Sequence, residues 1–580
     1  MKRLITFCII SFGMLTVSMA TVEKHPTDYV NPFIGTTNFG TTNPGAVCPN
    51  GMMSVVPFNV MGSEDNKYDK DARWWSTPYE YHNCFFTGYS HVNLSGVGCP
   101  ELGSLLLMPT TGKLSVDYKE YGSRYKDEQA SPGYYSNFLT RYNVKTEVTA
   151  TPRTGVARFT FPAGQSHVLL NLGEGLTNES GAFLRRTGEC EFEGMKLLGT
   201  FCYNPQAVFP IYFVMRANKQ PVASGYWKKQ RPMTGVEAEW DPDNGRYKLY
   251  TGYGKELAGD DIGAYLTFDT EESEQVEVQM GVSFVSIENA RLNLDAEQKG
   301  KDFARVREEA RHRWNDDLSR ILVEGGTEEQ KTVFYTALYH ALIHPNILQD
   351  VNGEYPAMES DKILTTQGDR YTVFSLWDTY RALHPLFNLV QRDINADIVN
   401  SMLAHYDKSV EHMLPVWSFY GNETWCMIGY HGASVIADAY VKGIPMDEKL
   451  ALEAVVSTST VPYLEGLKEY MELGYVPMEK SGSSASVTLE YGYDDWAIYH
   501  MAKKMGDREV ADTYLKRAGA YKHLVDERLG FIRPKNAAGQ MKEKFDVLDT
   551  HGQGFIEGNS WNYSFYVPQD VNGLKAFMGG

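Results

Sequence analysis

The stretch Val276-Glu277-Val278-Gln279-Met280-Gly281-Val282-Ser283-Phe284 and the segment after it decide how this 580-residue chain is organised. The stretch alternates apolar and polar residues, which is typical of a β-strand with one buried face. Soon afterwards the period changes, and Asp295 to Ile321 is rich in Lys, Arg and Glu. One helical stripe of that segment carries its apolar residues Phe303, Val306, Ala310 and Trp314. The sequence therefore predicts a β-domain followed by a connecting helix.

On the N-terminal side of that stretch, short apolar runs alternate with clusters of Gly, Pro, Asn and Asp. Examples are residues 168–172, 209–215 and 247–251. Such runs, a few residues long and separated by turn residues, predict an antiparallel β-sandwich, which we place at residues 21–288. The hydrophobic content of 43% is ample for packed cores, and the chain length favours two or more domains.

On the C-terminal side, helical patterns recur with polar or glycine-containing turns between them. They cover residues 328–344, 376–391, 394–407, 425–441, 447–471, 486–504 and 508–526. Serial helix hairpins of this kind can close into an (α/α)6 barrel. We assign residues 289–325 to a helical linker and 326–580 to a partial barrel, because a complete ring needs about twelve main helices.

The first residues read as a secretory signal. Lys2 and Arg3 precede an apolar run from Leu4 to Val17, and Ser18-Met19-Ala20 forms a small-residue cleavage site. We therefore predict a signal peptide at residues 1–20 and an exported protein, periplasmic or extracellular. No later segment offers about 20 uninterrupted apolar residues, so no membrane span is predicted.

The net charge, the aromatic content and the cysteines of the chain argue against several classes of function. A net charge of −18 argues against nucleic acids and anionic membranes, which select basic surfaces. The aromatic content of 13% suits carbohydrate recognition, although aromatic residues also fill β-domain cores. The seven cysteines form no C-x-x-C pair, which argues against a zinc ribbon or redox motif. Buried free thiols are the default, and Cys190–Cys202 is the closest candidate for a disulfide.

The segment Gly554-Phe555-Ile556-Glu557-Gly558-Asn559-Ser560-Trp561-Asn562-Tyr563 sets one carboxylate among glycines, amides and aromatic residues. Partial desolvation by the flanking rings would raise the pKa of Glu557 and keep it protonated near neutral pH. A protonated carboxyl of this kind can donate to a glycosidic oxygen. Taken alone, the segment also fits a hydrogen-bonded structural carboxylate or an exposed loop residue.

Five more segments accompany it and together carry a family resemblance. They are Ser375-Leu376-Trp377-Asp378-Thr379-Tyr380-Arg381, Asn422-Glu423-Thr424-Trp425-Cys426-Met427-Ile428-Gly429-Tyr430-His431, Leu489-Glu490-Tyr491-Gly492-Tyr493-Asp494-Asp495-Trp496, Val30-Asn31-Pro32-Phe33-Ile34-Gly35-Thr36 and Ser90-His91-Val92-Asn93-Leu94-Ser95-Gly96. With the Glu557 segment they resemble glycoside hydrolase family 92, secreted calcium-dependent exo-acting α-mannosidases.

The resemblance implies a β-supersandwich followed by an (α/α)6-barrel catalytic domain. It also implies inverting hydrolysis of terminal α-linked mannose, with Ca2+ as cofactor and α-mannoside glycans of the N-glycan or yeast-mannan type as substrates. The calcium ligands and the preferred linkage are not implied by any residue of the chain.

Matching residues suggest roles in the C-terminal part. Glu557 is the candidate general acid, and Asn559 could orient it or a sugar hydroxyl, while Trp561 is either a site residue or core. Asp378 would accept two hydroxyls of a terminal mannose, with Trp377 as a wall of the pocket. The alternative for Asp378 is a capping box with Ser375 at a helix start.

Further candidates are less specific. Glu423 and His431 match the family segment, although a histidine on a packed helix is more often a core residue. Trp75 and His91 resemble β-domain residues that pack against the sugar across the domain interface, and both are equally at home in a sandwich core.

Glu490 and Asp494 lie one helical turn apart. We expect either solvent exposure, or a position at the centre of the barrel as pocket residues or partners for Arg533.

Members of the family continue past the position of Gly580, with segments that supply metal contacts and the general base. We therefore expect a chain cut off inside its catalytic domain and nearly inactive. Two alternatives stay open: a non-catalytic mannose- or glycan-binding remnant, and another (α/α)6 carbohydrate-active enzyme such as a phosphorylase.

Overall fold

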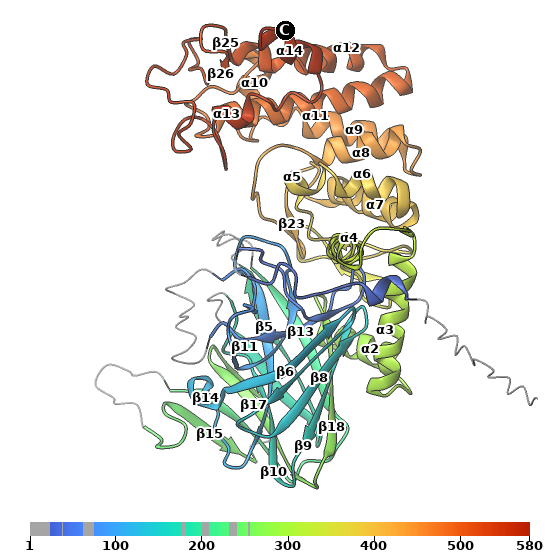
Figure 1. Ribbon diagram of the computed structural model, residues 1–580, viewed down its shortest axis with the longest axis vertical. Helices are drawn as coiled ribbons and strands as arrows, with labels where there is room; N and C mark the ends of the chain where they lie inside the picture. Colours follow the sequence, from blue (N-terminus) through green and yellow to red (C-terminus); the bar gives the residue numbers. More distant parts are fainter. Residues whose placement is uncertain are drawn as a thin grey trace, which may run out of the picture.

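The computed structural model describes residues 24–37, 39–61, 75–176, 181–199, 208–230, 240–252 and 256–580. The predicted signal peptide lies outside the described residues, and so does Cys202. Within the described part of the chain, the strands of the N-terminal domain form two large antiparallel sheets and the helices follow them (Figure 1). The predicted order of a β-sandwich and then a helical domain is therefore confirmed.

The first sheet has the strand order β1-β2-β4-β5-β10-β17-β14-β15. Its strands are β1 (Ala46–Val47), β2 (Ser54–Phe58), β4 (Gly88–Asn93), β5 (Leu102–Thr111), β10 (Gly164–Asn171), β17 (Ile262–Thr270), β14 (Ala223–Lys229) and β15 (Tyr247–Thr251). At its centre Leu170 lies opposite Leu107 on one neighbour and Ala264 on the other. All three side chains are buried, so this register places apolar residues side by side across the sheet.

The second sheet has the order β16-β11-β12-β13-β18-β9-β8-β7-β6-β3. Its strands are β16 (Leu257–Gly259), β11 (Ala182–Gly188), β12 (Glu191–Gly199), β13 (Val208–Ala217), β18 (Glu274–Ser283), β9 (Thr154–Phe161), β8 (Val144–Ala150), β7 (Tyr134–Leu139), β6 (Ser123–Ser131) and β3 (Phe85–Phe86). The stretch from Val276 to Phe284 forms most of β18. Its Val276, Val278 and Met280 are buried while Glu277 and Gln279 are half-buried, as the alternation predicts.

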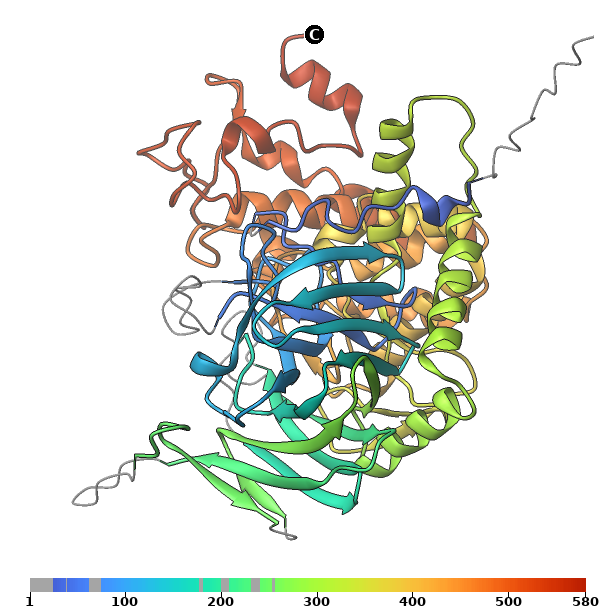
Figure 2. The ribbon, with the colours of Figure 1, turned by 60° about the horizontal axis from the view of Figure 1, so that its bottom comes forward.

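Two helices connect the domains, α2 (Ile287–Gln298) and α3 (Phe303–Leu318). The side chains of Ser286 and Asp302 cap their N-termini by accepting backbone N–H groups. The predicted stripe of α3 is buried against the sandwich, and the Trp314 indole donates to the Val47 carbonyl at 2.6 Å. Both helices run along one side of the sandwich in Figures 1 and 2.

Apart from the short α1 (Tyr118–Tyr121) in the sandwich domain, the remaining helices stack from α4, beside the sandwich, towards α14 at the far end of the molecule (Figure 1). They are α4 (Glu328–Ala341), α5 (Leu376–Thr379), α6 (Leu383–Val390), α7 (Arg392–Lys408), α8 (Gly432–Val441), α9 (Glu448–Thr458), α10 (Leu467–Leu473), α11 (Ser484–Met505), α12 (Arg508–Arg517), α13 (Ser560–Tyr563) and α14 (Val571–Phe577). Long α11 packs against α8 and α12 and forms the centre of this part.

Four predicted helices differ from those observed. The helix expected at 376–391 is divided into α5 and α6, and the helix expected at 508–526 ends at Arg517. The helix expected at 425–441 begins at Gly432, because residues 418–423 form the hairpin of β23 (Ser418–Phe419) and β24 (Asn422–Glu423). The helix expected at 447–471 is broken into α9 and α10, and Gly466 at the break has a φ of 60°. The α9 helix ends at Thr458, and Gly466 is the N-cap residue of α10, where glycine adopts left-handed backbone at little cost.

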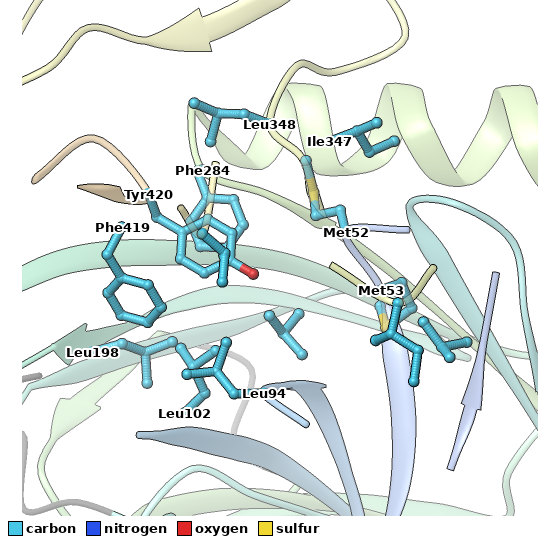
Figure 3. Close-up of a cluster of buried hydrophobic side chains, with 14 of the residues drawn as sticks. Met52, Met53, Leu94, Leu102, Leu198, Phe284, Ile347, Leu348, Phe419 and Tyr420 are labelled. Atoms are coloured by element: carbon cyan, nitrogen blue, oxygen red, sulfur yellow. The ribbon is translucent and has the colours of Figure 1, made fainter. Parts of the chain in front are cut away.

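The two domains share one apolar core (Figure 3). Met52, Leu94, Leu198 and Phe284 of the first domain meet residues of the second in this cluster. The ring of Phe284 stacks on that of Tyr420 with centroids 4.1 Å apart. The interface is therefore built like a domain interior, which favours a fixed placement of the domains.

Two smaller findings concern cysteines and membranes. Cys190 is a free thiol, so the predicted Cys190–Cys202 disulfide is wrong, whereas Cys99 is disulfide-bonded. Among the described residues, no helix has the length and apolar character needed to cross a bilayer.

Candidate functional site

A cavity of about 470 Å³ opens where the sandwich meets the helices. Segments far apart in the sequence line it. They are Ser95–Gly98, the end of α4 and the turn after it with His340, Ala341, His344 and Pro345, the α5 region with Val373, Phe374, Ser375, Asp378 and Thr379, then Leu383, His384, Trp417, Met427 and Glu557. A second cavity of about 470 Å³, lined in part by Arg153, Glu297 and Arg313, holds none of the residues predicted to form the site.

Asp378 occupies the first turn of α5, with its side chain exposed to the cavity. The Ser375 hydroxyl donates to the Asp378 carboxylate, but it makes no capping bond to the backbone of the helix. Ser375 therefore orients the carboxylate, and the predicted capping box is not formed. One carboxylate oxygen of Asp378 is held by the protein, while the group as a whole stays accessible.

Glu557 lies in the same cavity and is exposed, which is one of the alternatives that its segment left open. The predicted desolvation by aromatic rings is not observed. Phe555 packs against Tyr563 with centroids 5.6 Å apart, and Trp561, which is 52% exposed, tilts over Phe531. These rings stabilise the loop below Glu557 and leave its carboxylate open to the cavity.

The backbone of the cavity wall is unusual at three non-glycine residues. Glu557, Val373 and Met427 have φ values of 51°, 66° and 73°. Left-handed backbone costs about 1–3 kcal/mol for residues other than glycine, and it persists where the surroundings over-determine it. Such positions cluster at functional sites, which supports this cavity as the candidate site.

Asn559 lies two residues after Glu557 but does not line the cavity. Its Oδ1 accepts from the Asn562 N–H at 3.1 Å, and its amide donates to the Leu548 carbonyl at 2.9 Å. Asn559 is thus the N-cap of α13. It fixes the loop that carries Glu557, and no contact of its side chain reaches towards the cavity.

Trp377 and His431 lie behind the cavity wall. Trp377 is 7% exposed, and its indole donates to Glu490 at 2.8 Å, so it is not the pocket wall that was predicted. His431 stacks on Tyr380 at 4.1 Å and bonds Asp494 at 2.9 Å. Burial alone would lower the pKa of His431, but the carboxylates of Asp494 and Glu490 raise it.

Glu490 and Asp494 are both fully buried, so the expectation of solvent exposure is wrong. Arg381 pairs with Glu490 at 2.9 Å. The predicted partner Arg533 instead pairs with Asp526 at 2.8 Å.

Glu423 is also buried and does not line the cavity. Its carboxylate accepts the N–H groups of Val416, Trp417 and Trp425 at 3.0, 2.8 and 3.0 Å. Burial raises its pKa to about 7, although these hydrogen bonds oppose the shift. Glu423 therefore holds the loop that presents Trp417 and Met427 to the cavity.

The two β-domain candidates are core residues. Trp75 packs with Phe58, Met61 and Leu106 inside the sandwich. His91 on β4 bonds the Leu105 carbonyl at 2.7 Å, and burial lowers its pKa to about 4. The loop that follows β4 does reach the cavity, because the Ser95 N–H donates to His344 Nε2 at 3.1 Å.

Sequence reasoning missed three histidines of the cavity. Burial lowers the pKa values of His340, His344 and His384 to about 4, so all three present neutral rings. His340 Nε2 makes no hydrogen bond to any described residue. The spacing of these histidines in the sequence gives no signal for a shared site, since α4 and α6 bring them together.

The described residues offer no complete set of ligands for a metal ion. Across the described ranges, no three or more His, Cys, Asp or Glu side chains are grouped so that they could hold one. Asp378 and Glu557 supply oxygen ligands of the type that Ca2+ prefers, but the described residues alone do not complete a calcium site.

Comparisons with known proteins agree with this architecture. The model of the glycosyl hydrolase family 92 N-terminal domain matches residues 29–283, and that of the family 92 catalytic domain matches residues 289–580. A secreted glycosidase of Arthroderma benhamiae, described as uncharacterized, is 25% identical over 99% of this chain and 74% of its own length.

Two solved structures are similar over most of the chain. A family GH92 α-mannosidase from Bacteroides thetaiotaomicron is 37% identical, covers 96% of this chain and 73% of its own, and has a TM-score of 0.85. It was also solved in complex with mannoimidazole. An inverting family GH92 mannosidase from Bacteroides thetaiotaomicron VPI-5482 is 27% identical over 96% and 72% of the two chains, with a TM-score of 0.83. On the matches to both of its domains, this chain belongs to glycoside hydrolase family 92.

Proposed function

We propose that this chain is an exo-acting α-mannosidase that hydrolyses terminal α-linked mannose from glycans. The observation that carries the proposal is the meeting of Asp378 and Glu557 in one cavity between the domains. Membership of the family and the mannosidase names of the two solved relatives support the choice of sugar.

In the proposed mechanism Glu557 is the general acid and protonates the leaving glycosidic oxygen. Asp378 accepts two hydroxyls of the terminal mannose, and Ser375 holds its carboxylate in place. The unpaired Nε2 of neutral His340 can bond a further sugar hydroxyl. This set binds and orients one sugar next to a proton donor.

We further propose inversion of configuration, which the likeness to an inverting mannosidase supports. Inverting enzymes place a second carboxylate, which activates water, about 6.5–9.5 Å from the acid. We assign no residue of this chain as that base.

Calcium dependence is likewise a proposal. A bound calcium ion would chelate two adjacent sugar hydroxyls and favour distortion of the ring. Family membership supports it.

Export and substrate type complete the proposal. The N-terminal segment has the pattern of a signal peptide, and the relative from Arthroderma benhamiae is described as secreted. An exported mannosidase would meet glycans of the N-glycan or yeast-mannan type.

The test is mannose release from a panel of α-linked mannobioses, with and without added calcium or EDTA. We expect release of mannose whose first-formed anomer, seen by NMR, is β. Glu557→Gln should lower the rate about 10²–10⁴-fold, because general acid catalysis contributes that much. A matched control is Glu543→Gln, which changes an exposed carboxylate outside the cavity.

Other outcomes would contradict the proposal in different ways. Calorimetric binding of mannose without any release would favour a non-catalytic binding protein. Formation of a sugar 1-phosphate only when phosphate is supplied would indicate a phosphorylase. A Glu557→Gln variant as active as the parent would exclude Glu557 as the acid.

A further inference from the structure

Glu490, in the N-terminal half of α11, accepts several hydrogen bonds from residues next to Asp378. Its fully buried carboxylate accepts from the Trp377 indole at 2.8 Å, the Tyr380 hydroxyl at 3.0 Å and the Arg381 guanidinium at 2.9 Å. These three donors flank Asp378 on α5 and in the turn after it. One carboxylate thus fixes both sides of the turn that presents Asp378 to the cavity.

The same group of contacts reaches the segment that carries Glu557. The Tyr380 hydroxyl bonds that of Tyr566, and the Arg381 guanidinium lies 5.0 Å from the centre of the Tyr566 ring. Tyr566 lies just after α13, the short helix that follows Glu557. Contacts of Glu490 therefore extend, through one layer of side chains, to both segments that supply cavity carboxylates.

The N-terminal end of α11 holds the other side of the Glu557 segment. The Ala485 N–H donates to the Gly554 carbonyl at 3.0 Å, and the Ser486 hydroxyl accepts from the Ile556 N–H at 3.2 Å. The helix runs as one element from Ser484 to Met505. One helix therefore contacts both the segment that carries Glu557 and the turn that carries Asp378.

Two basic groups and a second carboxylate surround the buried carboxylate of Glu490. Asp494, one turn further along α11, lies next to His431, whose Nε2 is 3.5 Å from Glu490. Arg381 supplies the second positive charge. A buried carboxylate that lost its partners would be strongly destabilising, so the four groups depend on one another.

We propose that Glu490 is a positioning residue that sets the placement of Asp378 relative to Glu557. The inference rests on the proposed function, in which these two carboxylates act on one sugar. Misplacement of a reacting group by about 1 Å can cost about 10²-fold in rate. Glu490 itself does not line the cavity, so its effect on the reaction passes through the residues that it holds.

The experiment compares Glu490→Gln with Asp495→Asn. Asp495 is another fully buried carboxylate of the same helix, and it bonds Tyr430, Tyr470 and Arg517 at 2.7, 2.7 and 3.0 Å. None of these partners lines the cavity. For each protein, kcat and KM on an α-linked mannobiose are measured, together with hydrogen–deuterium exchange of residues 376–381 and 554–566.

For Glu490→Gln we expect kcat to fall about 10- to 100-fold with KM changed less than about 3-fold, because orientation affects the reacting geometry more than sugar binding. Exchange should rise in both segments. For Asp495→Asn we expect a lower Tm with kcat and the exchange of both segments unchanged.

A folded Glu490→Gln variant with unchanged kcat and exchange would overturn the proposal, and so would an equal loss of kcat in Asp495→Asn. Should Glu490→Gln fail to fold, Arg381→Lys carries the same expectation, since that side chain is 42% exposed and lysine cannot keep the planar contact. If the parent chain releases no mannose, the proposed function fails, while the exchange of the two segments still decides the positioning role.

Discussion

At the scale of single residues, the site consists of a few accessible side chains held by many buried ones. Asp378 and Glu557 are exposed in the cavity. Glu490, Glu423 and Asn559 lie outside it and hold their segments through hydrogen bonds. Residues within one family segment therefore divide into those that face the cavity and those that support it.

Asp378 gives the first prediction at this scale. Asp378→Ala should weaken the binding of mannoimidazole about 10- to 100-fold, because a hydrogen bond to a charged group contributes about 1.5–3 kcal/mol. Isothermal calorimetry measures the change. Asp361→Ala, at an exposed aspartate outside the cavity, is the matched control and should bind as the parent does. Undiminished binding by Asp378→Ala would remove Asp378 from the sugar site.

How far the sequence predicts the site can be judged from these residues. The segments around Asp378 and Glu557 were identified, and both side chains do lie in one cavity. Trp377, in the Asp378 segment, points inward, and so do Glu423 and His431 of the segment 422–431. Which side chain of a motif faces a ligand depends on the local backbone, and at Glu557 and Met427 that backbone is left-handed. Residue type alone does not reveal this.

At the scale of elements, strands and long helices follow their sequence patterns, and the irregular connections do not. The runs at 209–215 and 247–251 lie in strands, and so does the run at 168–172 except for its last residue. The predicted helix at 425–441 lost its first turns because Glu423 gathers the backbone N–H groups of the loop around itself. That carboxylate is a tertiary contact, which overrides local helix propensity.

The domain interface gives the element-scale prediction. Phe284→Ala should lower the free energy of unfolding by about 3–5 kcal/mol, because a buried ring is replaced by a cavity. Phe284 is 4% exposed and stacks on Tyr420, whereas Phe39 is fully exposed. Phe39→Ala is thus the control, and its urea unfolding curve should match that of the parent. An equal curve for Phe284→Ala would mean that the interface contributes little.

At the scale of the whole molecule, buried histidines couple stability to pH. Burial lowers the pKa values of His91, His340, His344 and His384 to about 4 and that of His405 to about 3. Their unfolded value is near 6.5. The unfolded chain binds more protons between these values. Burying these histidines as neutral rings therefore contributes fully to the free energy of unfolding above about pH 6.5. This contribution is lost as the pH falls through about 4.

His344→Gln tests this coupling at one position. Between pH 7 and pH 5 the free energy of unfolding should fall by about 2 kcal/mol less than in the parent. The reason is that the variant no longer has this histidine, which takes up a proton when the chain unfolds. Urea titrations at the two pH values measure it. His551→Gln, at a side chain that is 94% exposed, should leave the parent's pH dependence unchanged. An unaltered pH dependence in His344→Gln would refute the linkage.

The whole molecule also explains why the site lies where it does. The sandwich supplies Ser95–Gly98, the helices supply Asp378 and Glu557, and the shared core around Phe284 and Tyr420 keeps the two parts in place. A cavity at such a junction can be shaped by both domains.

The measurement that tests the central claim most directly is a crystal structure of this chain with mannoimidazole. We expect the ligand in the cavity between the domains, with its hydroxyls within hydrogen-bond distance of the Asp378 carboxylate and its imidazole facing Glu557. A ligand bound elsewhere, or contacts to neither carboxylate, would contradict the proposed mannosidase site.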